Sequence, residues 1–143
     1  MQQTKPKDDK YDALRLYSIL RSDISMSTGK ENAQAGHAYV DALLHSRSKN
    51  PQYFDLYAEL KPGTKICLDG KSELHLLELH DRLERDGIPS TLIYDKGHVE
   101  PPDFDGSRIL TALGVGPILP SEAPGYLRKL KLWPNRREEP SMC

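Results

Sequence analysis

Short apolar runs alternate with longer stretches of helical periodicity along this chain. Apolar runs that contain β-branched or aromatic residues predict buried strands over 14–20, 64–68, 88–94 and 108–115. Apolar positions spaced by three and four residues predict helices from Ser27 or Thr28 to about 47, over 51–60, from Ser72 to Gly87, and over 121–129. The stretch 95–107, rich in Gly, Pro and Asp, joins two predicted strands without a helix, so we expect a long loop there.

The first long helix carries the most informative polar side chains. Spacings of four and three residues place Lys30, Gln34 and His37 on one narrow stripe of that helix. A second stripe, about 90° away, is apolar and is expected to face the core. It consists of Ala33, Gly36, Val40 and Leu44. A cation, an amide and an imidazole would then lie beside a helix N-terminus, which favours phosphorylated or carbonyl-bearing ligands.

The order of the elements predicts a single α/β domain. Strands separated by helices favour a sheet with helices on both faces, and the loop 95–107 allows the last two strands to run antiparallel. We therefore expect a three-layer α/β/α fold with a four-stranded mixed sheet, whose last strand ends at Gly116-Pro117. The domain should span 13–133, between a flexible N-terminal arm (1–12) and a disordered tail (134–143).

Composition and charge exclude several classes of protein. The 143 residues carry a net charge of −1, so a nucleic-acid partner would need a local basic patch. No stretch approaches the roughly 20 apolar residues of a membrane span, and we expect no membrane association. The two cysteines are Cys67, expected to be a buried thiol, and the last residue, Cys143. They do not suggest a disulfide framework, which indicates the reducing cytoplasm.

Ligands of open α/β sheets gather at the carboxyl ends of the strands. Asp95 follows its predicted strand and should therefore lie near Lys30 and His37, with Thr111 on the next strand. Each residue also has a structural interpretation: a solvated lysine, a packed histidine, an Asx turn and a β-forming threonine. The sequence contains neither zinc-ligand spacing nor a nucleophile motif, so we expect no metal, no cofactor and no covalent intermediate.

Four segments occur in an order and at separations that resemble a known family. They are Gly29-Lys-Glu-Asn-Ala-Gln-Ala-Gly-His-Ala38, Ile93-Tyr-Asp-Lys-Gly97, Thr111-Ala-Leu-Gly-Val-Gly-Pro117 and Leu127-Arg-Lys-Leu-Lys-Leu132. Over about residues 16–132 the chain resembles the archaeal and eukaryotic-type peptidyl-tRNA hydrolases, the second structural class of that activity. The resemblance implies an α/β fold with a mixed four-stranded sheet. It also implies hydrolysis of the ester between a peptide and the 3′ ribose of tRNA.

The resemblance assigns roles to individual residues. The family's functional lysine, glutamine, histidine, aspartate and threonine fall on Lys30, Gln34, His37, Asp95 and Thr111. The catalytic candidates are Lys30, Asp95, Thr111 and His37, and the substrate-binding candidates are Gln34, Gly97, His98 and Arg21. Where the family continues with Arg-Thr, this chain has His98-Val99. The valine offers no hydroxyl, and the histidine replaces a positive charge only when it is protonated.

Ester hydrolysis requires an activated water and stabilisation of the oxyanion. We expect Asp95 to orient or deprotonate the water, or to fix His37 or Lys30, and Lys30 to stabilise the oxyanion or the terminal phosphate. Thr111 would donate or accept a hydrogen bond to substrate or water, and Gln34 and His37 would position the other side chains. The side chains expected to contact the tRNA backbone are Arg15, Arg21, Lys30, Lys96, Arg128, Lys129 and Lys131. Two alternatives stay open: a non-catalytic module on the same fold that binds tRNA or a protein, and a hydrolase of another ester or amide. The sequence also leaves a homodimer open.

Overall fold

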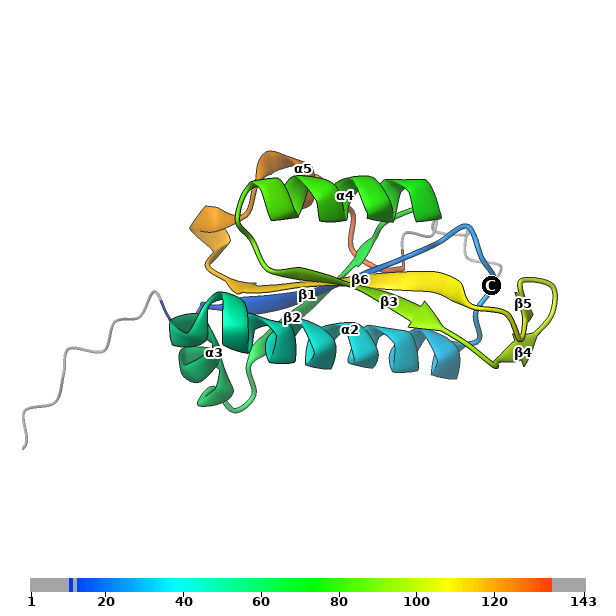
Figure 1. The fold of residues 1–143 in the computed structure, drawn as a ribbon, viewed down its shortest axis with the longest axis horizontal. Helices are drawn as coiled ribbons and strands as arrows, with labels where there is room; N and C mark the ends of the chain where they lie inside the picture. The colour runs from blue at the N-terminus through cyan, green and yellow to red at the C-terminus, as the bar shows by residue number, and fades with distance from the viewer. Residues whose placement is uncertain (1–10, 12, 135–143) are drawn as a thin grey trace, which may run out of the picture.

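A mixed four-stranded sheet forms the middle layer of the structure (Figure 1). The computed structural model describes residues 11 and 13–134. The sheet strands are, in chain order, β1 (Arg15–Leu20), β2 (Thr64–Asp69), β3 (Ser90–Asp95) and β6 (Ile109–Ile118). They lie side by side in the order β2-β1-β6-β3. β1 and β2 run parallel, and β6 runs antiparallel to both β1 and β3, as expected for the last two strands.

Helices cover both faces of this sheet, which confirms the predicted three-layer α/β/α arrangement (Figure 1). The helices are α2 (Thr28–Lys49), α3 (Pro51–Ala58), α4 (Glu73–Arg85) and α5 (Gly125–Arg128). α2 and α3 pack on one face, and α4 and α5 pack on the other. The side chains of Ser27 and Ser72 cap α2 and α4, as predicted. Both helices begin at the sheet edge where the parallel strands β1 and β2 end.

α2 turns a face of small residues toward the sheet, so the predicted apolar stripe is wrong. The buried residues of α2 are Gln34, Ala38, Ala42 and Ser46. The predicted stripe of Ala33, Gly36, Val40 and Leu44 is exposed or only partly buried. A Cβ atom added at Gly114 in β6 would lie 2.2 Å from the carbonyl oxygen of Ala38. Because the helix approaches the sheet this closely, only short side chains fit between them, and hydrophobicity alone selects the wrong face.

The last sheet strand extends beyond its predicted end. β6 continues through Gly116 and Pro117 to Ile118, with a register shift opposite β1. Gly116 adopts a φ of +100° and donates its N–H to the carbonyl of Pro89 at 3.0 Å, so a bulge keeps the strand attached. The single helix predicted over 121–129 is instead a 3-10 turn, η1 (Pro120–Glu122), followed by α5. Pro124 separates them because it has no N–H to continue a helix.

The stretch 95–107 contains a small antiparallel ribbon, so the prediction of a plain loop is wrong. The ribbon consists of β4 (Val99–Glu100) and β5 (Phe104–Asp105). At its base, Gly97 has a φ of +82° and donates its N–H to the carbonyl of Gly106 at 3.0 Å. The ribbon lies at the carboxyl end of β3, next to the start of α2 (Figure 1).

The segment after α5 packs back onto the sheet. Leu132 bridges to Leu68, and the backbone N–H of Trp133 donates to the carbonyl of Cys67 at 2.9 Å. Cys67 is partly buried, and this burial raises the pKa of its thiol to about 11. The predicted arm (1–12) and tail (134–143) lie outside the described residues, apart from positions 11 and 134. None of the helices in the described part of the chain is long and apolar enough to cross a membrane.

Candidate active site

Lys30 and Asp95 form an ion pair where the start of α2 meets the end of β3. The hydroxyl of Ser27 accepts a hydrogen bond from the backbone N–H of Lys30 at 3.2 Å, which fixes the first turn of the helix. The ammonium of Lys30 then donates to Oδ2 of Asp95. Only 8% of the Lys30 side chain and 19% of the Asp95 side chain are exposed. The sequence-based expectation that these two residues meet is therefore correct.

An aromatic ring lies against the Lys30 ammonium. Phe104, in β5, is 2% exposed, and its ring centroid lies 4.8 Å from the Lys30 Nζ. The imidazole of His98 contacts the same ring edge-on, with 5.3 Å between the two centroids. A cation held over an aromatic face is stabilised by the ring quadrupole, most strongly where water is excluded. Sequence reasoning missed Phe104, although its position as a lone phenylalanine in an acidic stretch was a usable signal.

One helical turn after Lys30 in α2, a buried pair of polar side chains joins this helix to β6. The hydroxyl of Thr111 donates to the side-chain carbonyl of Gln34, and the two residues are 0% and 1% exposed. The same hydroxyl oxygen lies 3.4 Å from the carbonyl of Ile93 in β3. Because a buried amide oxygen needs a donor, this contact fixes the rotation of α2 against the sheet. It thereby holds Lys30 beside the end of β3.

Carboxylates of the ribbon hold the connection between β1 and α2. Oε1 of Glu100 accepts the backbone N–H of Ser27 at 2.9 Å, and Oε2 of Glu100 contacts Nε2 of His98 at 2.9 Å. Asp103 accepts the backbone N–H of Ser25 at 2.6 Å. The hydrogen bond from His98, supported by those from Ser27, keeps the pKa of Glu100 below its ordinary value. These acidic residues therefore position the start of α2.

The sequence has relatives of similar length among known proteins. A sequence model described as "Peptidyl-tRNA hydrolase PTH2" matches residues 14–133. The chain belongs to this family. A peptidyl-tRNA hydrolase from Methanocaldococcus jannaschii is 33% identical over 107 residues, which cover 73% of this chain and 86% of that protein. Proteins of the same name from Methanococcus vannielii and Pyrobaculum aerophilum are each 36% identical, over 80% and 84% of this chain and 94% and 98% of theirs.

The residues that carry the peptidyl-tRNA hydrolase resemblance do not all meet in one cluster. The structure pairs Lys30 with Asp95 and, one helical turn further along α2, Gln34 with Thr111. His37 is exposed on α2, seven residues beyond Lys30, or about 10 Å along the helix axis at 1.5 Å per residue. The expectation that Asp95 lies close to both Lys30 and His37 therefore holds only for Lys30.

Arg15 and Arg21, both expected to contact the tRNA backbone, lie at opposite ends of β1. Arg21 is 8% exposed, and its Nε and Nη2 donate to the two carboxylate oxygens of Asp23 at 2.9 Å each. A third donor, Nη1, binds the carbonyl of Leu110 at 3.0 Å. The hydrogen bond to Asp23 raises the pKa of the guanidinium. Arg21 thus fixes the end of β1, whereas Arg15 starts that strand and lies at its opposite end.

The family's Arg-Thr positions fall on the ribbon. His98 is partly buried between Glu100 and Phe104, and Val99 is 67% exposed. Gly97, expected to bind substrate, forms the turn that leads into them. In the part of the chain that the structure describes, no group of three or more His, Cys, Asp or Glu side chains could hold a metal ion.

Proposed function

We propose that the Lys30–Asp95 pair hydrolyses the ester bond between peptide and tRNA in peptidyl-tRNA, with water as the nucleophile. Family membership supports the substrate and the reaction. The observation that carries the proposal is the partly buried ion pair at the carboxyl-terminal edge of the sheet. Ligands of α/β proteins bind at that edge, and both α2 and β3 present a functional side chain there.

Asp95 is proposed to orient and deprotonate the attacking water, and to return that proton to the ribose 3′ oxygen as the ester C–O bond breaks, which leaves the peptide carboxylate and the free 3′ hydroxyl of tRNA. A carboxylate has two oxygens, and Oδ2 of Asp95 accepts the hydrogen bond from Lys30. Oδ1 then remains for a water molecule at the partly exposed end of β3. The ion pair fixes the direction of the carboxylate, so that a water held by Oδ1 has a defined position.

Lys30 is proposed to stabilise the oxyanion that forms at the ester carbonyl. Its ammonium has three N–H donors, of which one binds Asp95. The low exposure of the side chain strengthens its interaction with a developing negative charge, because little water competes. The start of α2 adds positive potential from its own backbone N–H groups.

Gln34 and Thr111 are proposed as positioning residues. Thr111 is fully buried and acts through Gln34 on the placement of α2. His37 lies too far along α2 to position Lys30. Because it is exposed on the same side of the helix, we propose that it contacts the bound tRNA or peptide. Gly97 and His98, which lead into the ribbon, are proposed to contact the substrate.

A gel assay on a model peptidyl-tRNA tests the proposal. Hydrolysis by the parent chain is compared with hydrolysis by the Lys30→Ala and Asp95→Ala variants. Asp81→Ala, at an exposed position in α4, serves as the control for loss of a carboxylate. The parent and the control should release free tRNA, and the two site variants should not. A parent chain that shifts tRNA on the gel but leaves the ester intact would instead support the non-catalytic module. That alternative is suggested by Val99, which stands where the family has a threonine and offers no hydroxyl.

Two further properties follow from the sequence-based predictions. We propose that the chain acts in the reducing cytoplasm, where Cys67 would stay a thiol. The sequence leaves a homodimer open, and the particle mass in solution, measured by light scattering, decides between monomer and dimer.

A further inference from the structure

Three lysines from two separate segments line a hollow of about 400 Å³ at the carboxyl-terminal edge of the sheet. Lys71 belongs to the connection between β2 and α4, and Lys129 and Lys131 follow α5. We infer that this hollow binds a backbone phosphate of the tRNA whose ester lies at the Lys30–Asp95 pair. The inference rests on the proposed function and specifies where the nucleic acid lies.

Asp69 joins the two segments that supply the lysines. Its Oδ1 accepts the backbone N–H of Lys71 at 2.8 Å, and its own backbone N–H donates to the carbonyl of Lys131 at 2.8 Å. The carbonyl of Lys71 in turn accepts the backbone N–H groups of Ser22 and Asp23, at 3.2 and 3.0 Å. The lysine backbones are therefore held in place relative to the loop that leads into α2.

The charge of the hollow is positive. Three lysines and one carboxylate line it; the carboxylate is that of Asp69, which is 4% exposed and already bound to the Lys71 backbone. Nδ1 of His75 contacts the carbonyl of Gly70 at 2.7 Å, so Nε2 is the ring nitrogen of His75 that is left for a ligand. The stretch 123–134 adds Arg128 and contains no acidic residue. In a chain with a net charge of −1, this local excess favours an anionic ligand.

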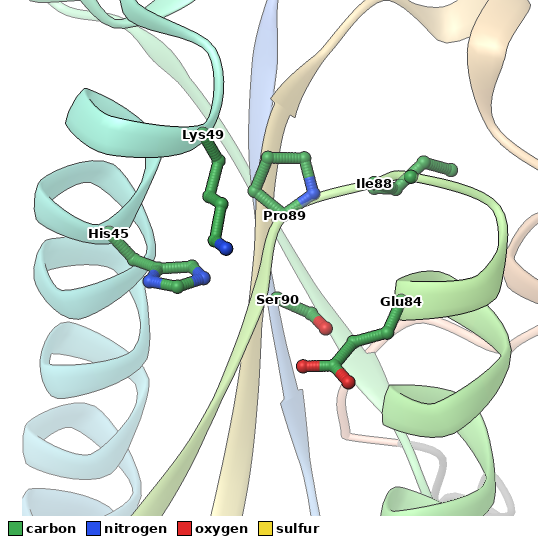
Figure 2. A pocket seen from close by; sticks show the side chains of 7 residues that line it. His45, Lys49, Glu84, Ile88, Pro89 and Ser90 are labelled. Atoms are coloured by element: carbon green, nitrogen blue, oxygen red, sulfur yellow. The ribbon is translucent and has the colours of Figure 1, made fainter.

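A second hollow, of about 340 Å³, lacks these properties (Figure 2). It lies at the amino-terminal end of β3, between the last turns of α2 and α4, where His45 and Lys49 face Glu84. Helix carboxyl ends repel anions, and Glu84 offsets the charge of Lys49. His80 also contacts Ser90 at 2.7 Å and Glu84 at 3.2 Å, so these polar groups bind one another. The lysine hollow is therefore the better phosphate site.

The lysine hollow lies at the same level of the sheet as the catalytic pair. Asp69 pairs with Leu20, Leu20 with Ala112, and Ala112 with Ile93, two residues before Asp95. Three strand spacings of about 4.8 Å separate β2 from β3 by roughly 14 Å within the sheet. The tRNA strand must also pass from the face covered by α2, which carries Lys30, to the face covered by α4 and α5. At about 3.4 Å per stacked nucleotide, the path corresponds to at least roughly four nucleotides. A strand whose 3′ ester reaches Lys30 would thus place a phosphate near Lys71, Lys129 and Lys131.

Charge-neutralised variants test the inference. The double variant Lys129→Gln/Lys131→Gln is compared with Lys49→Gln/Lys61→Gln, which removes two exposed charges at the opposite end of the sheet. The affinity of each variant for deacylated tRNA is measured from about 50 to 200 mM salt. The first variant should bind about tenfold more weakly, and the log–log slope of its affinity against salt concentration should fall in magnitude by about 0.7–0.9, the value for one phosphate contact. The second should match the parent.

Two further substrates separate this inference from the proposed function. On peptidyl-tRNA, the first double variant should lose kcat/KM mainly through a higher KM. On a peptidyl ester of adenosine, which is too short to reach the hollow, the two double variants should behave alike. If the parent hydrolyses peptidyl-tRNA but the two double variants bind tRNA equally well, the phosphate site is wrong and the proposed function stands. A parent that neither binds tRNA nor cleaves the ester would overturn both.

Discussion

The ammonium of Lys30 and the carboxylate of Asp95 are 65 positions apart in the chain and hydrogen-bonded in the fold. The contact depends on three features around it. α2 lies very close to β6, the pair of Gln34 and Thr111 fixes the helix rotation, and the ribbon holds the helix start. Each feature can be disturbed separately, which gives distinct predictions.

Close packing of α2 on the sheet predicts opposite effects of alanine at two glycines. Gly114→Ala would place a Cβ atom 2.2 Å from the Ala38 carbonyl, so α2 must move. We expect a loss of about 1–3 kcal/mol in the free energy of unfolding and a loss of activity. Gly36→Ala, within α2 with no atom in reach of the added Cβ, should gain about 0.5–1 kcal/mol. Urea denaturation measures both, and equal effects at the two positions would contradict the close approach.

The buried pair of Gln34 and Thr111 predicts a cost for removing one partner. Thr111→Val keeps the shape but leaves the Gln34 carbonyl without its donor, which should cost about 1–3 kcal/mol of unfolding free energy. Thr91→Val, on edge strand β3, should change it by less than about 0.5 kcal/mol. Adding Gln34→Leu to Thr111→Val should restore part of the loss. A double variant as unstable as the sum of the single variants would argue against the pairing.

The ribbon contact of Glu100 predicts a transition at low pH. Hydrogen bonds from His98 and Ser27 lower the pKa of Glu100, so the folded state favours its ionised form. Its contribution to stability is therefore complete above the ordinary glutamate pKa of about 4.3 and is lost as pH falls through the lowered value. The amide resonance of Ser27 should report this titration by NMR. In Glu100→Gln the transition should disappear, and a midpoint at or above 4.3 in the parent would contradict the assignment.

Burial of Cys67 predicts slow thiol chemistry. With a thiol pKa of about 11, roughly one molecule in a thousand carries the thiolate at pH 8. In a Cys143→Ser background, which leaves Cys67 as the remaining cysteine, alkylation should be far slower than that of a small free thiol. Reaction at the rate of an exposed cysteine would show that this strand is not covered as described.

The meeting of Lys30 and Asp95 could be predicted because it depends on chain order and helix capping. A helix that follows a strand starts at that strand's carboxyl end, and capping signals such as Ser27 are local. Helical spacing placed Gln34 on the stripe of Lys30, and strand order placed Thr111 on the next strand, but no local pattern indicates the direct contact between them. The family resemblance added the expectation that both residues are functional.

The sequence-based predictions were wrong for the buried face of α2, which depends on the distance between helix and sheet, and for the ribbon. The buried face of α2 is lined by Ala38 and Ala42 because Gly114 lets the helix approach, and a hydrophobicity pattern favours Val40 and Leu44 instead. The ribbon was missed because its two strands have only two residues each and no alternating pattern. Phe104 therefore appeared to lie in a loop, although it packs on Lys30.

The most direct test of the account is a double-mutant cycle on the central ion pair, read as kcat/KM for peptidyl-tRNA. Lys30→Met and Asp95→Asn should each lower kcat/KM by about 10²–10³-fold, and the double variant should be little worse than either, since the two groups act as one unit. The exposed pair Asp81 and Arg85 on α4 is the matched control, and its double variant Asp81→Asn/Arg85→Met should stay within about twofold of the parent. Losses at Lys30 and Asp95 that multiply independently, or that do not exceed the control, would contradict the account.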